Sequence, residues 1–347
     1  MRYIGSKARL AGNLAEHIGA PSHGRFIDAF CGTGAVAEVA SELGWSVVVN
    51  DMMNFAVALS SARLLTEAQT PFSALGGYGE TVRLLNKLPP MSGFVTSQYS
   101  PRSLDVVGFE RRYFTVENAA RIDAIRAQIA RWSDASRISD LETTLLLADL
   151  LRASSRVANT SGTFGCFLSK WTAQSQSDLV IRPRKRPKAS AGLQARVGDA
   201  TTLDADPDDT IYFDPPYTKR QYASYYHILE TITLGDAPEV EGVCGLRPWK
   251  HKASTFCYKS KATDALRQLI EGTRANRVLL SYSSEGHVGL DDLRLILSSY
   301  RSAEFHPIDT IGRYRPNAGA SRNGSAVTEY LAVIEKEANA SPALEMA

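Results

Sequence analysis

Alternation of apolar and polar positions divides the N-terminal part of the chain into short regular segments. Residues 25–30 (RFIDAF) form an apolar run that predicts a buried strand, and residues 31–34 (CGTG) predict a tight glycine turn. Residues 35–43 have helical spacing, and the valine-rich run at 45–50 predicts a second strand that ends at Asp51. This order indicates a β-α-β unit with a glycine-rich loop after its first strand.

The same alternation returns in the later part of the chain. Apolar strands alternate there with amphipathic helices, which is the order expected for an open α/β sheet. The predicted elements are strands at 210–213 and 277–282, helices at 221–234 and 291–300, and an antiparallel pair at 304–314 and 327–335.

The segment between these two parts has a different pattern. Residues 65–153 combine helix breakers, aromatic residues and arginines with two helical periods, at 119–132 and 141–152. A basic, proline-punctuated loop follows at 182–188. We therefore expect an α/β protein with a doubly wound, Rossmann-like core, interrupted by a mainly helical insertion. The expected divisions are a core at 1–64 and 154–335, an insertion at 65–153 and a disordered tail at 336–347.

Composition adds the class of protein to this picture. Of the 347 residues, 44% are hydrophobic and 22% are charged, as in globular proteins. No apolar run reaches the ~18 residues of a membrane-spanning helix, and the N-terminus lacks the apolar core of a signal peptide, so we expect a cytoplasmic protein. The four cysteines include no C-x-x-C pair and the six histidines show no ligand spacing, so we expect reduced thiols and no metal.

Charge is distributed unevenly although the net charge is only +2. Residues 65–196 contain 18 Lys and Arg against 11 Asp and Glu, a local balance of +7, which leaves −5 for the remainder. A basic segment inside an acidic chain is expected of a lobe that faces DNA. A solvated helical surface explains the same distribution equally well.

The first candidate motif is the glycine loop, Phe30-Cys31-Gly32-Thr33-Gly34. Glycines at this spacing let a ligand approach the backbone at a helix N-terminus, and the carboxylate of Asp51 at the end of the next strand is suited to ribose hydroxyls. Taken alone, the motif is typical of methyltransferases. It is also typical of dinucleotide-binding proteins, since Ala37 completes G-x-G-x-x-A, and of a structural turn.

The second motif, Asp214-Pro215-Pro216-Tyr217, follows the predicted strand at 210–213 and narrows these alternatives. Ligands bind at the carboxyl ends of strands in open α/β sheets. An exocyclic amine such as adenine N6 is a poor nucleophile because its lone pair is delocalised into the ring. The Asp214 carboxylate and the Pro215 carbonyl can each accept one amine hydrogen, and Tyr217 offers a face for a flipped base. A plain strand-to-turn corner is the structural alternative.

The two motifs together resemble the D12-class, Dam-like adenine-N6 DNA methyltransferases of restriction-modification systems. The opening segment at 2–7 (RYIGSK) is similar to that family's first motif, and residues 198–200 (GDA) are similar to its adenine-contacting segment. The resemblance implies S-adenosylmethionine as cofactor, base flipping, double-stranded DNA as partner and a cognate restriction endonuclease as a candidate partner. It also makes the insertion the target-recognition domain.

The resulting candidate residues fall into three groups. The cofactor group combines the glycine loop with residues implied by the resemblance: Tyr3, Lys7, Phe30, Gly32, Thr33, Gly34, Asp51, Asp199 and Ala200. The catalytic group is Asp214, Pro215, Pro216 and Tyr217. The DNA-contacting candidates are Arg184, Lys185, Arg186, Arg313 and Arg315, the last two in what is equally an exposed hairpin loop.

Other functions remain to be compared with this one. An RNA adenine-N6 methyltransferase can share the second motif, and a non-catalytic DNA-binding subunit can share the fold. A glutamine methyltransferase is expected to carry Asn in place of Asp214, and a cytosine-C5 enzyme needs a Pro-Cys dipeptide, which this chain lacks. Tyr222, Tyr225 and Tyr226 either line a base pocket or pack in the core.

Overall fold

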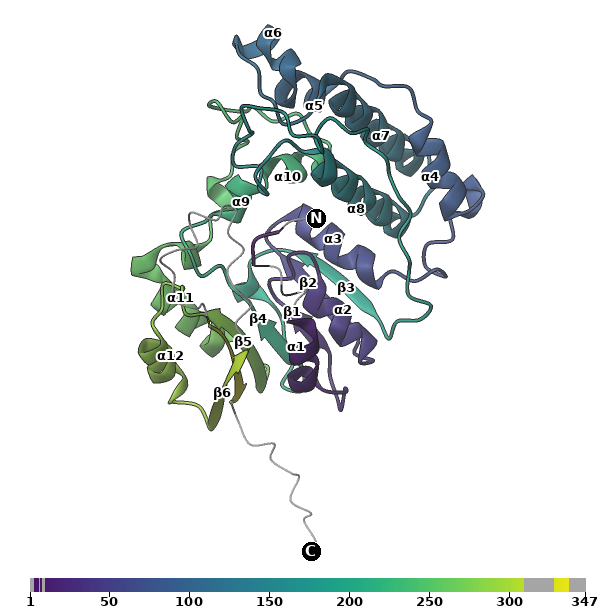
Figure 1. Ribbon diagram of the computed structural model, residues 1–347. Coiled ribbons are helices and arrows are strands. Elements are labelled where there is room, and N and C mark those ends of the chain that lie inside the picture. The colour runs from purple at the N-terminus through teal and green to yellow at the C-terminus, as the bar shows by residue number, and fades with distance from the viewer. Residues whose placement is uncertain (1–2, 6, 8–9, 309–327, 337–347) are drawn as a thin grey trace, which may run out of the picture.

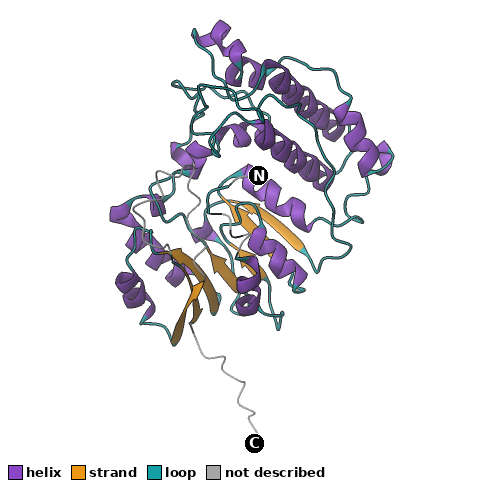
Figure 2. Ribbon diagram, in the orientation of Figure 1, coloured by secondary structure: helices purple, strands orange, loops and turns teal. Residues whose placement is uncertain are grey.

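A mixed sheet forms the centre of the molecule (Figures 1 and 2). The computed structural model describes residues 3–5, 7, 10–308 and 328–336. In this part of the chain the sheet has seven strands in the order β3-β2-β1-β4-β5-β7-β6. The strands are β1 (Phe26–Asp28), β2 (Val47–Asp51), β3 (Leu193–Val197), β4 (Thr210–Phe213), β5 (Arg277–Ser283), β6 (Ser302–Ile308) and β7 (Glu329–Glu335). The first five are parallel to one another, and β7 is antiparallel to both β5 and β6.

Helices cover both faces of this sheet. The helices of the described residues are α1 (Ala11–Ile18), α2 (Ala35–Glu42), α3 (Asn54–Leu64), α4 (Tyr78–Asn86), α5 (Phe94–Tyr99), α6 (Leu104–Val107), α7 (Val116–Asp134), α8 (Asp140–Val157), α9 (Tyr222–Tyr225), α10 (His227–Leu234), α11 (Lys259–Gly272) and α12 (Leu290–Leu297). Side chains alternate along each strand, so Phe26 belongs to the core formed with α1, α2 and α3, whereas Ile27 belongs to the core formed with α11 and α12. The expected doubly wound α/β architecture is confirmed.

A further helical layer packs on α3, away from the sheet. Nearly every residue of α3 is buried: Val57 belongs to the core against the sheet, and Phe55 and Leu59 belong to the core of the helical layer. Helices α4, α5, α7, α8 and α10 supply the rest of that core (Figure 1). The expected boundary at residue 153 falls inside α8, and the core continues through α3 and α10. The helical layer therefore rests directly on the half of the molecule that contains the sheet.

Local signals explain where the two long helices of this layer begin. The Thr115 side chain accepts a hydrogen bond from Asn118 N at the start of α7. A capping box formed by Ser139 and Glu142 starts α8. The helices expected at 119–132 and 141–152 are present, and both are longer than expected.

Two expectations differ from the structure in detail. The helix expected at 221–234 is two helices, because the backbone at Tyr226 leaves the helical region with φ −124° and ψ 22°. Strand β3 was not expected, because its residues LQARV lie at the sheet edge, where none of them is buried. The antiparallel pair is present as β6 and β7; residues 309–327 between them and 337–347 of the tail lie outside the described residues.

Candidate active site

The strand order places both sequence motifs at one point of the sheet. The chain runs from β1 outward through β2 to β3, then returns to β4 beside β1 and continues the other way. Such a switch point opens a crevice at the carboxyl ends of the two central strands. The glycine loop follows β1 and residues 214–217 follow β4, so both lie at this crevice.

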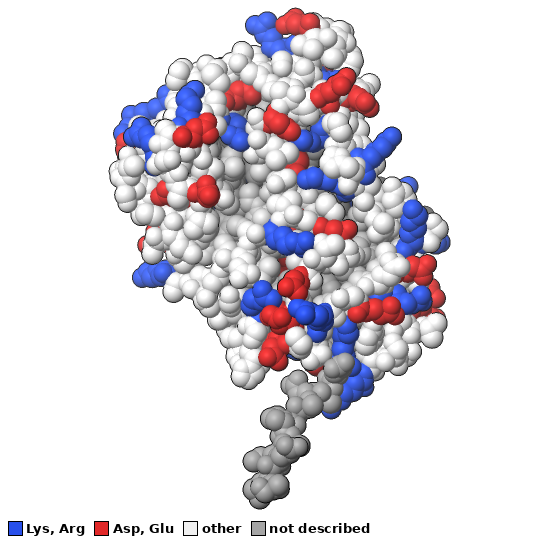
Figure 3. Space-filling model, turned by 180° about the vertical axis from the view of Figure 1, so that it is seen from behind, with Lys and Arg blue, Asp and Glu red and all other residues white. Residues whose placement is uncertain are grey.

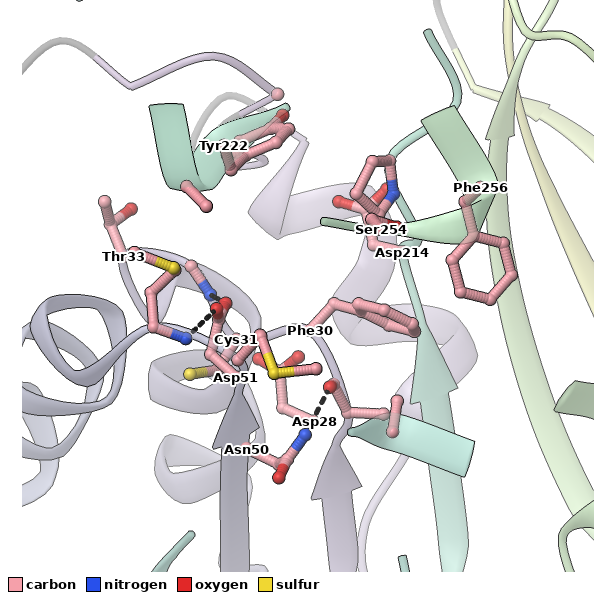
Figure 4. A pocket seen from close by; sticks show the side chains of 18 of the residues that line it. Asp28, Phe30, Cys31, Thr33, Asn50, Asp51, Asp214, Tyr222, Ser254 and Phe256 are labelled. Atoms are coloured by element: carbon pink, nitrogen blue, oxygen red, sulfur yellow. Dashed lines mark hydrogen bonds between the residues drawn. The ribbon is translucent and has the colours of Figure 1, made fainter. Parts of the chain in front are cut away.

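A cleft of about 1090 Å³, counted with its open mouth, occupies that crevice. Its walls combine the opening segment, the glycine loop, the end of β2 and the start of the catalytic motif (Figure 4). Of the residues proposed from the sequence, those that line it are Tyr3, Lys7, Phe30, Gly32, Thr33, Asp51, Asp199, Ala200, Asp214 and Pro216. Gly34, Pro215 and Tyr217 are not among the lining residues.

The two positions of the loop require glycine for different structural reasons. Gly32 has φ 50°, and a Cβ there would lie 2.9 Å from the Tyr3 ring, so glycine lets the opening segment close onto the loop. Gly34 has φ 77° and caps α2, and a Cβ there would lie 2.6 Å from the Cα of Ser60 in α3. Gly34 therefore serves helix packing, and Gly32 serves the cleft.

The carboxylate of Asp51 is held in place at the end of β2. One oxygen accepts a hydrogen bond from Gly32 N at 3.1 Å and the other accepts one from Met53 N at 3.0 Å. Burial raises the pKa of Asp51 to about 6, and these two bonds oppose the rise. Asp51 is therefore mainly ionised at neutral pH, with lone pairs left for a ligand in the cleft (Figure 4).

Asp28, at the end of β1, lines the cleft but was not predicted as a site residue from the sequence. It is 1% exposed, and no hydrogen bond of ordinary geometry reaches either carboxylate oxygen from the described residues. Burial, with the nearby charges of Asp214 and Asp51, raises the pKa of Asp28 to about 8, although the Ala37 and Phe30 backbones oppose it. The available signal was an acid inside the apolar run RFIDAF.

The opposite wall comes from an irregular segment after α10, which no sequence motif marked. Lys252, Ser254 and Phe256 line the cleft there. The Lys252 ammonium donates to Met52 O at 3.0 Å and to a Glu230 carboxylate oxygen at 2.8 Å. Phe256 meets Phe30 edge to face, with ring centroids 5.7 Å apart.

Tyrosines of α9 and of the turn after it hold the opening segment over the cleft. The Tyr222 hydroxyl donates to Ile4 O at 3.0 Å, and Ile4 N donates to the Tyr226 hydroxyl at 2.8 Å. Tyr3 stacks on Tyr226 with ring centroids 4.8 Å apart. Tyr222 lines the cleft, and Tyr226 is buried in the core, as one of the two alternatives for these tyrosines expects.

At the far side of the cleft, Asp214 directly follows β4 and lies next to Lys7. Lys7 Nζ lies 3.2 Å from Asp214 Oδ1 and 2.9 Å from Oε2 of Glu329, the first residue of β7. Burial raises the pKa of Asp214 to about 6; Lys7 opposes this rise and Glu329 adds to it. Burial disfavours the charge of Lys7, yet Asp214 and Glu329 hold its pKa well above the usual value.

Tyr217 lies beside this group without lining the cleft. Its ring meets Tyr282 edge to face at 5.9 Å, and Lys7 Nζ lies 5.6 Å from the ring centroid. The Tyr217 hydroxyl lies 3.4 Å from Glu329 Oε1. Its face is therefore partly used by the protein, and stacking on a target base stays a prediction.

The basic loop is bound to the helical layer more than expected. The Arg186 guanidinium donates to Thr70 and lies 4.6 Å above the Tyr78 ring, and Arg184 is partly buried beside it. These contacts hold Arg186 against the protein, whereas Lys185 is exposed. Arg313 and Arg315 lie outside the described residues. On the back of the molecule, basic and acidic side chains are interspersed (Figure 3).

Two further searches cover the described residues only. No helix among them is long and apolar enough to cross a membrane. Within the same ranges, no cluster of three or more His, Cys, Asp or Glu side chains is arranged to hold a metal ion.

Comparison with known proteins agrees with this geometry. Residues 3–310 match the D12 class N6 adenine-specific DNA methyltransferase family. The chain is 36% identical to the type II methyltransferase M.FokI of Planomicrobium okeanokoites, over 97% of this chain and 53% of the relative. It is 32% identical to the modification methylase StsI of Streptococcus sanguinis, over 86% of this chain and 46% of the relative. It is also 32% identical to the type II methyltransferase M.NlaIII of Neisseria lactamica, over 97% of this chain and 99% of the relative.

The extent of these matches shows to which family the chain belongs. The chain spans about half the length of M.FokI and StsI, but nearly the whole length of M.NlaIII. The family match includes both the glycine loop and Asp214-Pro215-Pro216-Tyr217. The chain belongs to the D12 class of N6 adenine-specific DNA methyltransferases.

Proposed function

We propose that this chain transfers a methyl group from S-adenosylmethionine to N6 of an adenine in double-stranded DNA, at a specific sequence. The observation that carries the proposal is a single cleft with Asp51 and the buried Asp28 on one side and Asp214 on the other. A cofactor bound between the first two and a target amine at the third would meet within one cavity.

The cleft residues fit S-adenosylmethionine group by group. Asp51 keeps lone pairs free for ribose hydroxyls, and the buried carboxylate of Asp28 suits an ammonium group. Phe30 and Phe256 offer apolar walls for a flat ring. When bound there, S-adenosylmethionine supplies an electrophilic methyl group on a sulfonium ion.

The chain's own residues prepare the amine for transfer. Asp214 is mainly ionised above about pH 6 and can accept one N6 hydrogen, and the Pro215 carbonyl can accept the other. This arrangement frees the N6 lone pair to form the new N–C bond, while the sulfur keeps the electron pair of the broken S–C bond and becomes a thioether. N6 then carries the positive charge and loses a proton to Asp214 or to water. Orientation and electrostatics supply the catalysis.

Base flipping follows from the position of Asp214. The Asp214 side chain lines the cleft at the end of β4 and is only 13% exposed, so a duplex cannot reach it with its bases stacked. A paired adenine also holds one N6 hydrogen against thymine. The adenine must therefore leave the stack, at a cost of a few kcal/mol.

Methyl-transfer assays with labelled S-adenosylmethionine test the proposed substrate. Duplex DNA should accept the label and RNA of the same sequence should not; label on RNA alone would favour the RNA enzyme, and label on neither would favour a non-catalytic subunit. A mismatch opposite the target adenine should tighten binding, because the pairing cost is already removed. Unchanged or weaker binding to the mismatch would contradict flipping.

The biological context of the enzyme is part of the same proposal. The names of the relatives as type II methyltransferases and modification methylases support a restriction-modification role. A cognate endonuclease, a cytoplasmic location and target recognition by the helical layer at 65–153 are proposed on this basis. Sequencing modified bases in DNA from cells that express the chain would identify the recognised sequence.

A further inference from the structure

A buried lysine shared by two carboxylates lies beside the catalytic motif. Lys7 comes from the opening segment, Asp214 from the end of β4 and Glu329 from the start of β7. The Lys7 side chain is 5% exposed, and its Nζ lies 3.2 Å from Asp214 Oδ1 and 2.9 Å from Glu329 Oε2. The proposed chemistry uses Asp214 and leaves Glu329 without a role.

The net charge of Lys7, Asp214 and Glu329 indicates a role for Glu329. Lys7 with Asp214 alone would be a neutral pair, in which the ammonium weakens the carboxylate as an acceptor. A second carboxylate on Lys7 makes the group of three negative by one charge. Methyl transfer places positive charge on N6, so a negative environment favours the transition state.

Glu329 also reaches the last residue of the motif. Its Oε1 lies 3.4 Å from the Tyr217 hydroxyl, while its Oε2 holds Lys7. One side chain thus contacts two groups that flank Asp214. We infer that Glu329 is a positioning residue for methyl transfer: it holds Lys7 and Tyr217 and keeps Asp214 a strong acceptor for an N6 hydrogen. This inference rests on the proposed function.

A purely structural role makes a different prediction. The ion pair joins Lys7 to Glu329 across most of the chain, so it could simply fix the opening segment to the sheet. Loss of that role would lower thermal stability and leave the protonation of Asp214 unchanged. If Glu329 instead keeps Asp214 a strong acceptor, it must raise the pKa of Asp214. The charge of Glu329 does raise the pKa of Asp214.

The other ionisable groups around Asp214 are the same in a Glu329 variant. Among the described residues they are Lys7, Asp28 from β1, Tyr212 from β4, Tyr217 after β4 and Tyr222 from α9. A shift in Asp214 titration on neutralising residue 329 is therefore assignable to that residue.

Glu329→Gln is the decisive variant, because Gln keeps the shape and an oxygen for Lys7 but removes the charge. The acid limb of the kcat–pH profile should move down by about one pH unit, and the plateau kcat should fall roughly 10-fold. The KM for S-adenosylmethionine should stay within about twofold, since Glu329 does not line the cleft. Glu329→Asp should return the acid limb to the wild-type position.

A measurement without cofactor or DNA separates the two proposals. Carboxyl NMR of 13C-aspartate-labelled protein, assigned with Asp214→Asn, should show a lower Asp214 pKa in Glu329→Gln. Glu335→Gln, at the other end of β7, is the matched control and should change neither the titration nor kcat. If Glu329→Gln does not fold, Lys7→Met/Glu329→Gln compared with Lys7→Met measures the same charge effect.

The outcomes are distinct. An unchanged Asp214 titration in Glu329→Gln, or an unchanged acid limb and plateau in an active enzyme, overturns the inference. A wild-type protein that methylates no adenine overturns the proposed function, and the NMR titration still decides whether Glu329 acts on Asp214.

Discussion

The cleft and the helical layer both bury carboxylates, but they surround them differently. Asp123 in α7 is 9% exposed and accepts hydrogen bonds from Val95 N, Thr96 N and Thr96 Oγ1, which hold α5 against α7. Asp28 in the cleft is buried, and none of the described residues gives it a hydrogen bond of ordinary geometry. A buried polar group without a partner is costly, so its presence in a cleft indicates a group reserved for a ligand.

Buried cations of the helical layer follow the same rule as Asp123. Arg111 is buried and donates to Gly242 O, Val243 O and the Gln98 side chain, which fixes the segment after α10 to the insertion. The basic loop behaves similarly at Arg186. Charged side chains of the helical layer therefore stabilise its structure through hydrogen bonds. Charged side chains of the cleft are only partly hydrogen-bonded by the described residues.

The largest effect should follow from removing the acceptor in the cleft. Asp214→Ala should lower kcat by roughly 100-fold or more, because a preorganised acceptor for the reacting amine is lost. Binding of S-adenosylmethionine should change little, since Asp214 is assigned to the amine. Transfer assays and calorimetry measure the two, with exposed Asp264→Ala in α11 as control. Turnover within tenfold of wild type would remove Asp214 from catalysis.

In the helical layer, the corresponding change should affect folding alone. Asp123→Ala leaves two backbone N–H groups and the Thr96 hydroxyl without their acceptor, so the free energy of unfolding should fall by about 2–3 kcal/mol. Chemical denaturation measures this loss, and calorimetry should find S-adenosylmethionine binding unchanged. A loss below about 0.5 kcal/mol would mean that these bonds contribute little to stability.

Asp28→Asn should have the opposite effect on stability. With a folded pKa of about 8, Asp28 keeps its proton while the unfolded chain releases it above about pH 4, so wild-type stability falls as pH rises between these values. The variant lacks this fall and should be more stable at pH 8 by roughly 1–3 kcal/mol, converging with wild type near pH 4.

The same variant tests the ligand assigned to Asp28. An ammonium group that binds ionised Asp28 displaces its proton, so wild type should release up to one proton on binding S-adenosylmethionine at pH 7. Calorimetry in buffers of different ionisation enthalpy measures the release. Asp28→Asn should bind about 10-fold more weakly and lose the release. Equal binding and equal release would place the ammonium elsewhere.

The smallest effect separates two neighbouring basic residues. Lys185→Gln should weaken DNA binding for all sequences and flatten its salt dependence by about 0.9, the value for one phosphate contact. Arg186→Gln should leave that slope unchanged and lower stability by about 1 kcal/mol, because it loses its bonds to Thr70. A steeper change in slope for Arg186 than for Lys185 would reverse the assignment.

The same contrast explains how much the sequence could predict. Valine-rich β2, apolar β4 and the two motifs after central strands were found because their signals are local. Asp28 was hidden inside an apolar strand, and Lys252 lies in an irregular segment without a motif. Glu329 contacts Lys7 only because β7 inserts between β5 and β6. Such groups depend on tertiary contacts, which no local spacing records.

Identification of the methylated nucleoside tests the central claim most directly. Duplex DNA treated with the protein and S-adenosylmethionine is digested to nucleosides and analysed by mass spectrometry, with Asp214→Ala as the matched control. The wild type should yield N6-methyldeoxyadenosine, and the variant should yield none. A methylated cytosine, or equal amounts of product from the variant, would contradict it.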